Sequence, residues 1–255
     1  MQTQSVNYDQ VASEYAAHRQ IHSGVFHELC EMGCLSSDSA VLEVGCGSGN
    51  YIRALTGRFG CTGYGLDPSA AMLAQARTRR ATAAWVQARA ERLGVCDAAF
   101  DLIFSVDVIH HVADKASFYH EAARALRPGG RICTVTDSAD IIRRREILSG
   151  YFPETVQIEL ARYPRIAQLE AWMAAAALTE FQVTTAQESY EITNAQPFRD
   201  KAYSSLHLIP EPAWLGGLER LERDLARGPV RGTSRYACVW GRKPVRLIEG
   251  LDRAT

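Results

Sequence analysis

Three features are scarce in this sequence, and each absence excludes a class of protein. No apolar run approaches the ~18 residues that a helix needs to cross a bilayer, so we expect no membrane span. The seven cysteines are scattered and none forms a CxxC pair, which favours a reduced, cytoplasmic setting and no metal site. With 28 basic and 29 acidic residues the formal charge is −1, which argues against a general nucleic-acid or membrane-surface binder.

The first half of the chain alternates short apolar segments with helical patterns. Such alternation predicts βαβ units, right-handed crossovers and a parallel sheet with helices on both faces. Two further strands are expected in the second half, so the sheet would be Rossmann-like, seven-stranded and mostly parallel. The expected strands are residues 40–44, 61–67, 83–88, 100–108, 131–137, 181–192 and 236–243.

The segments around this sheet suit a single domain of 255 residues. We expect an N-terminal helical cap over residues 1–39 and a ligand-binding core over residues 40–137. Residues 138–243 would add helical insertions after the fifth and sixth strands, and residues 244–255 a tail. The opening "MQTQSVNYDQ" lacks the basic-then-apolar pattern of a signal peptide, which agrees with a cytoplasmic location.

The stretch "VLEVGCGSGN" at residues 41–50 joins the first expected strand to a turn with glycine at three alternate positions. Glycine lets the backbone turn sharply and approach a ligand without a Cβ clash. The spacing is G-x-G-x-G, so the third glycine of a dinucleotide fingerprint would fall on Asn50. Asp67 follows Gly47 by 20 positions and can accept from two ribose hydroxyls. The pattern predicts an adenosine-type ligand, either a dinucleotide or a nucleoside without phosphates.

Resemblance to a family decides between these ligands. "VLEVGCGSG", "GYGLDPSAAML", "ARAERLGVCDAAFDLIFS", "HHV" and "EAARALRPGGRI" occur in this order over about residues 40–137. Together they resemble the class I S-adenosylmethionine-dependent methyltransferases, above all the small-molecule branch. The opening "YDQVASEYAAHR" resembles the N-terminal helix that closes over the cofactor there. The resemblance implies methyl transfer from S-adenosylmethionine to an oxygen, nitrogen or carbon of a small metabolite, with S-adenosylhomocysteine as product.

The resemblance also implies residues that hold the cofactor. The glycine turn would pass beneath its methionine and ribose parts, Asp67 would bind the ribose hydroxyls, and the residues after the third strand would meet the adenine. Arg89 stands where small-molecule members often carry an adenine-binding aspartate, so two alternatives are open: backbone alone meets the adenine edge, or Arg89 turns outward. The implied cofactor-binding residues are Tyr15, Arg19, Glu43, Gly45, Cys46, Gly47, Gly49, Asp67, Pro68, Ser69, Met72, Ala90, Glu91 and Ser105.

His110 and His111 are the candidate catalytic residues. They follow the fourth strand, whose carboxyl end faces the expected cleft. Histidine suits proton removal from a nucleophile near neutral pH. Because adjacent residues point different ways, at most one is expected to reach the substrate. The alternative is that His111 braces the loop and His110 only shapes the pocket.

Substrate contacts are expected from the insertions. The basic run at residues 143–145 could meet an acidic substrate, but a solvated helix face is the favoured interpretation. Aromatic side chains could line an apolar pocket, although core packing explains most of them equally well. These candidates are Tyr151, Phe152, Tyr163, Trp172, Tyr203, His207 and Trp214.

Other functions remain open at this point. One is a tRNA or protein methyltransferase, which the neutral charge and the sequence "SVDVIHHV" after the fourth strand disfavour. Another is a scaffold that binds S-adenosylmethionine without catalysis, and a third is a nicotinamide dehydrogenase, which Asn50 disfavours. The expected partner is a small molecule, with no nucleic acid and no membrane, and the protein as monomer or homodimer.

Overall fold

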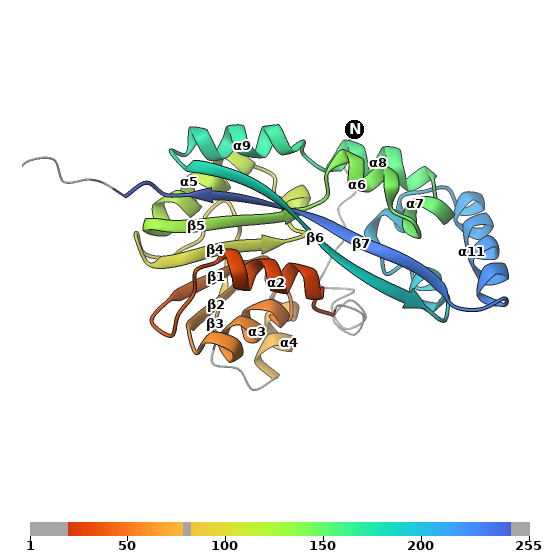
Figure 1. The fold of residues 1–255 in the computed structure, drawn as a ribbon, viewed down its shortest axis with the longest axis horizontal. Helices are drawn as coiled ribbons and strands as arrows, with labels where there is room; N and C mark the ends of the chain where they lie inside the picture. The colour runs from red at the N-terminus through yellow and green to blue at the C-terminus, as the bar shows by residue number, and fades with distance from the viewer. Residues whose placement is uncertain (1–19, 79–82, 246–255) are drawn as a thin grey trace, which may run out of the picture.

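A seven-stranded mixed sheet organises the chain (Figure 1), whose computed structural model describes residues 20–78 and 83–245. The strand order is β3-β2-β1-β4-β5-β7-β6. The first five strands are parallel, and β7 runs antiparallel to both neighbours, which confirms the predicted mostly parallel sheet. The strands are β1 (Ala40–Val44), β2 (Thr62–Asp67), β3 (Ala83–Gln87), β4 (Phe100–Val106), β5 (Leu126–Thr136), β6 (Thr179–Ile192) and β7 (Val230–Arg242).

Helices cover both faces of the sheet and form the two insertions. In Figure 1, α2 and α3 lie on one face and α5 and α9 on the other, and each layer has its own apolar cluster. The helices are α2 (Ser23–Met32), α3 (Asn50–Phe59), α4 (Ala70–Thr78), η1 (Ile109–His111), α5 (Lys115–Ala125), α6 (Ala139–Arg144), α7 (Leu148–Tyr151), α8 (Glu154–Arg162), α9 (Ile166–Ala175), α10 (Gln196–Arg199), η2 (Ser204–His207) and α11 (Glu211–Leu225).

Three strands begin earlier than the sequence predicted: β6 by two residues, β5 by five and β7 by six. The expected turn at residues 128–130 lies inside β5, which already pairs at Leu126 with Phe100 across a register shift. Gly129 has a φ of 83°, and a Cβ at Gly130 would lie 3.0 Å from the Phe100 carbonyl oxygen. The glycines therefore form an irregularity within the strand, as β-bulges do, instead of ending it.

β7 begins at Val230, six residues before the predicted start at Tyr236. Its last six residues pair with β5, whereas residues 230–236 pair only with residues 186–192 of β6. The two strands thus continue beyond the sheet as a two-stranded ribbon, which Figure 1 shows as the long twisted pair reaching α11. We call residues 186–192 and 230–236 the β6–β7 ribbon.

A third apolar cluster lies at the end of this ribbon. It is built by α7, α10, η2 and α11, with Phe152, Phe198 and Leu221 buried at its centre. Phe152 and Phe198 stack with ring centroids 5.6 Å apart. The second half of the chain therefore adds a small core of its own beside the carboxyl ends of the strands.

Within the described ranges, no helix is both long and apolar enough to span a membrane.

Candidate active site

The glycine turn after β1 requires backbone conformations that other residues rarely adopt. Gly45, Gly47 and Gly49 have φ angles of 71°, 52° and 72°. A Cβ at Gly45 would lie 2.4 Å from a methyl of Val108, and one at Gly49 would lie 2.2 Å from the Trp85 ring. At Gly47 no atom lies within 4 Å of that position. The missing side chains at Gly45 and Gly49 therefore make room for Val108 and Trp85 of the protein itself, whereas Gly47 faces open space.

Two buried carboxylates hold this turn in place. Asp67, at the end of β2, accepts hydrogen bonds from the Gly47 amide at 2.8 Å and the Ser69 amide at 2.9 Å. Glu43, inside β1, accepts from the Ile52 amide in the first turn of α3 at 2.9 Å. Burial raises the pKa of Glu43 to about 8, and the negative charge of Asp67 adds to the rise. The two acids link β1, β2 and the start of α3 into one rigid corner.

The other predicted cofactor residues of the described chain lie around this corner. Cys46, Ser69, Met72 and Ala90 are buried, and Pro68 is exposed. Burial raises the pKa of the Cys46 thiol, so this cysteine is an uncharged filler and not a nucleophile. Tyr15 and Arg19 lie outside the described residues.

The residues after β3 show where Arg89 points. Its side chain is 69% exposed and pairs with Glu91 at 3.4 Å, which agrees with an arginine turned outward. Glu91 also accepts a hydrogen bond from the Ala113 amide at 3.0 Å. Glu91 therefore ties the segment after β3 to the loop that follows the two histidines. At the end of β4, the hydroxyl of Ser105 is buried and has no hydrogen-bond partner among the described residues.

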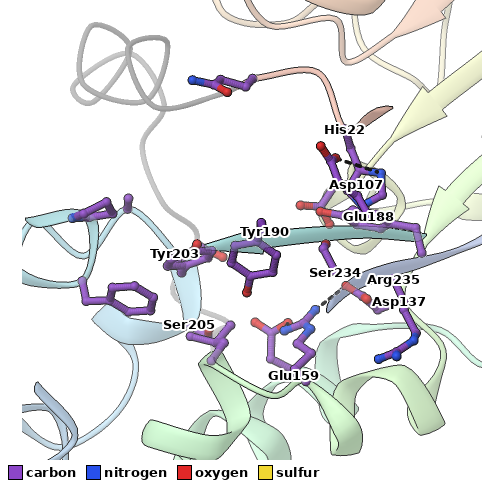
Figure 2. Close-up of a pocket in the computed structure, with 18 of the residues that line it drawn as sticks. His22, Asp107, Asp137, Glu159, Glu188, Tyr190, Tyr203, Ser205, Ser234 and Arg235 are labelled. Atoms are coloured by element: carbon purple, nitrogen blue, oxygen red, sulfur yellow. Dashed lines mark hydrogen bonds and ion pairs between the residues drawn. The ribbon is translucent and has the colours of Figure 1, made fainter. Parts of the chain in front are cut away.

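A cavity of about 470 Å³ lies beside this corner (Figure 2). Its walls come from residues 20–22 before α2, the segments that follow β4 and β5, the insertion between residues 145 and 163, the β6–β7 ribbon and residues 197–207. The three glycines are not among its lining residues, whereas Tyr51 in α3 and both candidate histidines are. The cavity thus lies at the carboxyl ends of the parallel strands, where ligands of such sheets bind.

His110 and His111 differ in their exposure to solvent. The His110 side chain is 3% exposed and its ring stacks on Tyr163 with centroids 4.1 Å apart. His111 is exposed, and its ring lies 3.9 Å from that of His110. Both reach the cavity wall. The structure therefore leaves either histidine in a position to meet a bound molecule.

Asp107 joins these rings at the end of β4. It accepts a hydrogen bond from the Tyr163 hydroxyl at 2.7 Å and lies 3.7 Å from Nδ1 of His110. Its φ of 58° is unusual for a residue other than glycine. Strained residues of this kind cluster at functional sites. The sequence analysis does not single out Asp107. The one local signal for it is its spacing, three positions before His110.

The basic run at residues 143–145 divides between surface and interior. Arg143 and Arg144 are exposed on α6, as the favoured interpretation held. Arg145 follows the end of α6 and turns inward, where it pairs with Asp137 and, at 3.0 Å, with Glu159. Burial raises the pKa of Asp137 to about 7, and the guanidinium of Arg145 opposes this rise.

The aromatic candidates of the second half also divide. Tyr163, Tyr203 and His207 line the cavity, and Tyr190 and Tyr236, which were not singled out, line it from the β6–β7 ribbon. The others serve the apolar clusters: Phe152 is buried in the third cluster, with Tyr151 and Trp214 against it, and Trp172 packs on the first. Figure 2 shows the rings of Tyr190 and Tyr203 projecting into the cavity.

Comparison with known proteins identifies the matching family. Residues 42–134 match the family described as "Methyltransferase domain". The 2-methyl-6-phytyl-1,4-hydroquinone methyltransferase of Synechocystis sp. is 31% identical over 174 residues, which cover 63% of this chain and 54% of that protein. This chain spans about half or less of the length of the first curated relatives that it matches.

Solved structures show the same fold at low identity. A phosphoethanolamine N-methyltransferase 2 of Haemonchus contortus, in complex with phosphomonomethylethanolamine and S-adenosylhomocysteine, has a TM-score of 0.60 at 20% identity and covers 92% of this chain and 57% of its own. The [4+2]-cyclase SpnF has a TM-score of 0.61 at 18% identity and covers 94% of both chains. At such identities the likeness concerns the fold alone.

Proposed function

We propose that this chain, which belongs to the class I S-adenosylmethionine-dependent methyltransferases, transfers a methyl group from S-adenosylmethionine to an oxygen, nitrogen or carbon of a small metabolite in the cavity. The observation that carries the proposal is the pairing of an open Gly47 with the 470 Å³ cavity at the same edge of the sheet. Secondary metabolites belong to this substrate class. The balanced charge argues against nucleic-acid substrates, and the scattered cysteines support a cytoplasmic location.

The residues of the corner suit an adenosyl sulfonium. Gly47 leaves room for a ligand to approach the backbone, and the positive φ angles keep that room open. A carboxylate has about four acceptor sites, so the two backbone bonds to Asp67 are compatible with ribose hydroxyl donors. The buried Ser105 hydroxyl gives the methionine end a polar contact. Glu43 places a carboxyl group behind the turn, where a positively charged ligand would favour its ionised form.

When bound, S-adenosylmethionine supplies a methyl group that its positively charged sulfur has already activated. The protein then has to orient the acceptor towards that methyl group and exclude water. The β6–β7 ribbon and residues 197–207 close the cavity on the side away from the corner. His110 or His111 accepts the proton of an acceptor hydroxyl or amine. The Asp107 carboxylate, 3.7 Å from Nδ1 of His110, is placed to stabilise that ring once it is protonated.

Calorimetric titration tests the cofactor. We expect micromolar binding of S-adenosylmethionine and S-adenosylhomocysteine, and no comparable binding of NAD. Asp67→Ala should weaken that binding by about 1–3 kcal/mol, the usual cost of removing hydrogen bonds within a polar site. Binding of NAD without binding of the sulfonium would overturn the proposal.

Single alanine variants test the candidate bases. His110→Ala and His111→Ala should each keep their affinity for S-adenosylhomocysteine, and the variant that lacks the base should lose turnover by about 10²–10⁴-fold. Turnover is measured with a labelled methyl donor over a metabolite panel. Unchanged turnover in both variants would remove general-base catalysis and leave methyl transfer by alignment alone.

A scaffold that binds the cofactor without methyl transfer is the second candidate. The fold alone does not decide this, because a structure of the same fold is named as a [4+2]-cyclase. The same labelled-donor assay separates the two candidates. Tight S-adenosylhomocysteine binding with no transfer to any acceptor would favour the scaffold.

A further inference from the structure

The charges that line the cavity are unequal in number. Among the described residues, six carboxylates and three cationic side chains face it. Arg145 is bound by Asp137 and Glu159, and Arg235 pairs with Glu146 at 3.3 Å. Both arginines thus already hold carboxylates, and the third cation, Lys201, lies 4.3 Å from the centroid of the Trp214 ring. A cationic guest would therefore meet a surplus of negative charge. This asymmetry disfavours a carboxylate or phosphate acceptor.

The β6–β7 ribbon concentrates one of these carboxylates between two aromatic rings. Glu188 and Tyr190 are two positions apart on β6, so their side chains share one face of the strand. Tyr236 is paired with Ala186 and therefore shares that same face on β7. All three residues line the cavity, and the Glu188 side chain is 33% exposed. Figure 2 shows Glu188 and Tyr190 side by side along the strand that borders the cavity.

A carboxylate flanked by tyrosine rings is suited to an ammonium group. Aromatic faces attract cations, and the attraction strengthens when the cation leaves water. Glu188 also accepts a hydrogen bond from the Ser23 amide at 2.8 Å and lies 3.7 Å from Nδ1 of His22. Burial lowers the pKa of His22, so this histidine is uncharged at neutral pH and does not neutralise Glu188. The negative charge remains available to a ligand.

We propose that the methyl acceptor is an amine, positively charged when it enters, whose ammonium group binds at Glu188 between Tyr190 and Tyr236. Before transfer the ammonium gives one proton to His110 or His111, which line the same cavity, and the freed nitrogen lone pair then forms the bond to the methyl carbon as the bond from that carbon to sulfur breaks. That the bound amine receives the methyl group rests on the proposed function, but the binding of an amine can be measured without turnover. It names a substrate class that the matched domain, residues 42–134, does not encode, because Glu188, Tyr190 and Tyr236 lie outside it.

Matched probes of one shape test the inference. Protein saturated with S-adenosylhomocysteine is titrated at pH 7 with 2-phenylethylamine, 2-phenylethanol and 3-phenylpropionate, and dissociation constants are measured by NMR shift perturbation. We expect the amine to bind at least tenfold more tightly than the alcohol, and the carboxylate to bind most weakly. An alcohol or carboxylate that binds as tightly as the amine would overturn the inference.

Two variants on the same strand locate the charge. Glu188→Gln keeps an oxygen that can accept from the Ser23 amide but removes the charge, and it should abolish the preference for the amine. Glu191→Gln is the matched control, because Glu191 lies on the opposite face of β6 and pairs with Arg231 outside the cavity lining. It should keep the preference. A Glu188→Gln protein that still prefers the amine, or an equal loss in both variants, would contradict the inference.

The two proposals fail in distinguishable ways. Titration with S-adenosylhomocysteine alone tests the methyltransferase, and absence of that binding would overturn the proposed function. The amine titration, repeated without cofactor, then still reports whether the cavity selects a cation. Cofactor binding together with a preference for the alcohol would leave the proposed function intact and overturn the amine.

Discussion

A matched pair of alanine substitutions separates backbone strain from ligand contact at the glycine turn. Gly47 and Gly60 have φ angles of 52° and 70°, and an added Cβ has no contact within 4 Å at Gly47 and only the Ser37 Cβ at 4.0 Å at Gly60. Alanine at either position should therefore cost only the left-handed strain, about 1–2 kcal/mol of unfolding free energy. Gly60 ends α3 at its far end, so only Gly47 faces the candidate ligand.

Cofactor affinity should then divide the pair. The methyl of Gly47→Ala occupies the space that the ligand would fill, and displacing one hydrogen bond to a charged ligand costs about 1.5–3 kcal/mol. This predicts about a 10- to 150-fold loss of affinity for S-adenosylhomocysteine in Gly47→Ala, and unchanged affinity in Gly60→Ala. Urea unfolding measures the strain and calorimetry the affinity. Equal affinities in the two variants would refute the role given to Gly47.

Two further predictions concern buried charge. Because the pKa of Glu43 is raised to about 8, the unfolded chain loses this proton near pH 4.5 and the folded protein only near 8, so stability falls as the pH rises between these values. Glu43→Gln should remove that fall, so the variant should be more stable than wild type by up to about 4 kcal/mol of unfolding free energy at pH 8. Urea unfolding of both proteins at pH 5 and pH 8 measures this. The same difference between variant and wild type at both pH values would contradict the prediction. Arg145→Gln should lower the free energy of unfolding by about 3–5 kcal/mol, because Asp137 loses its cationic partner and Glu159, which also pairs with Arg162 at 3.4 Å, loses part of its counter-charge. Adding Asp137→Asn should restore part of that loss, and a double variant no more stable than the single one would speak against the pairing.

The parallel part of the sheet was predictable because each strand carries its own signal. The segment "FDLIFSV" is nearly all apolar, and β4 lies between β1 and β5 with both faces covered. The ends of β5 and β7 were not predictable in the same way. Pro128, Gly129 and Gly130 have turn chemistry, and long-range pairing places them within a strand: Leu126 pairs with Phe100, and Gly129 and Gly130 exchange backbone hydrogen bonds with Lys243. Tertiary pairing overrode the local signal.

The candidate site was predictable on one side only. The glycine turn and Asp67 are close in sequence and lie at neighbouring strand ends, so spacing was enough to bring them together. The cavity joins residues that spacing cannot connect: Tyr163 bonds Asp107 from 56 positions away, and Glu188 meets the Ser23 amide across 165. The sequence predicts the same solvated helix face for Arg145 as for Arg143 and Arg144, because no local pattern shows that the chain turns inward after α6.

The β6–β7 ribbon allows the two halves of this chain to diversify independently. Residues 237–242 of β7 are fixed by pairing with β5, whereas residues 186–192 and 230–236 pair only with each other. Substitutions on the cavity face of that free length can change which molecule is accepted without touching the corner formed by Gly47 and Asp67. Natural variation in acceptor preference should therefore concentrate along the β6–β7 ribbon, and this ribbon is the first place to introduce a new specificity.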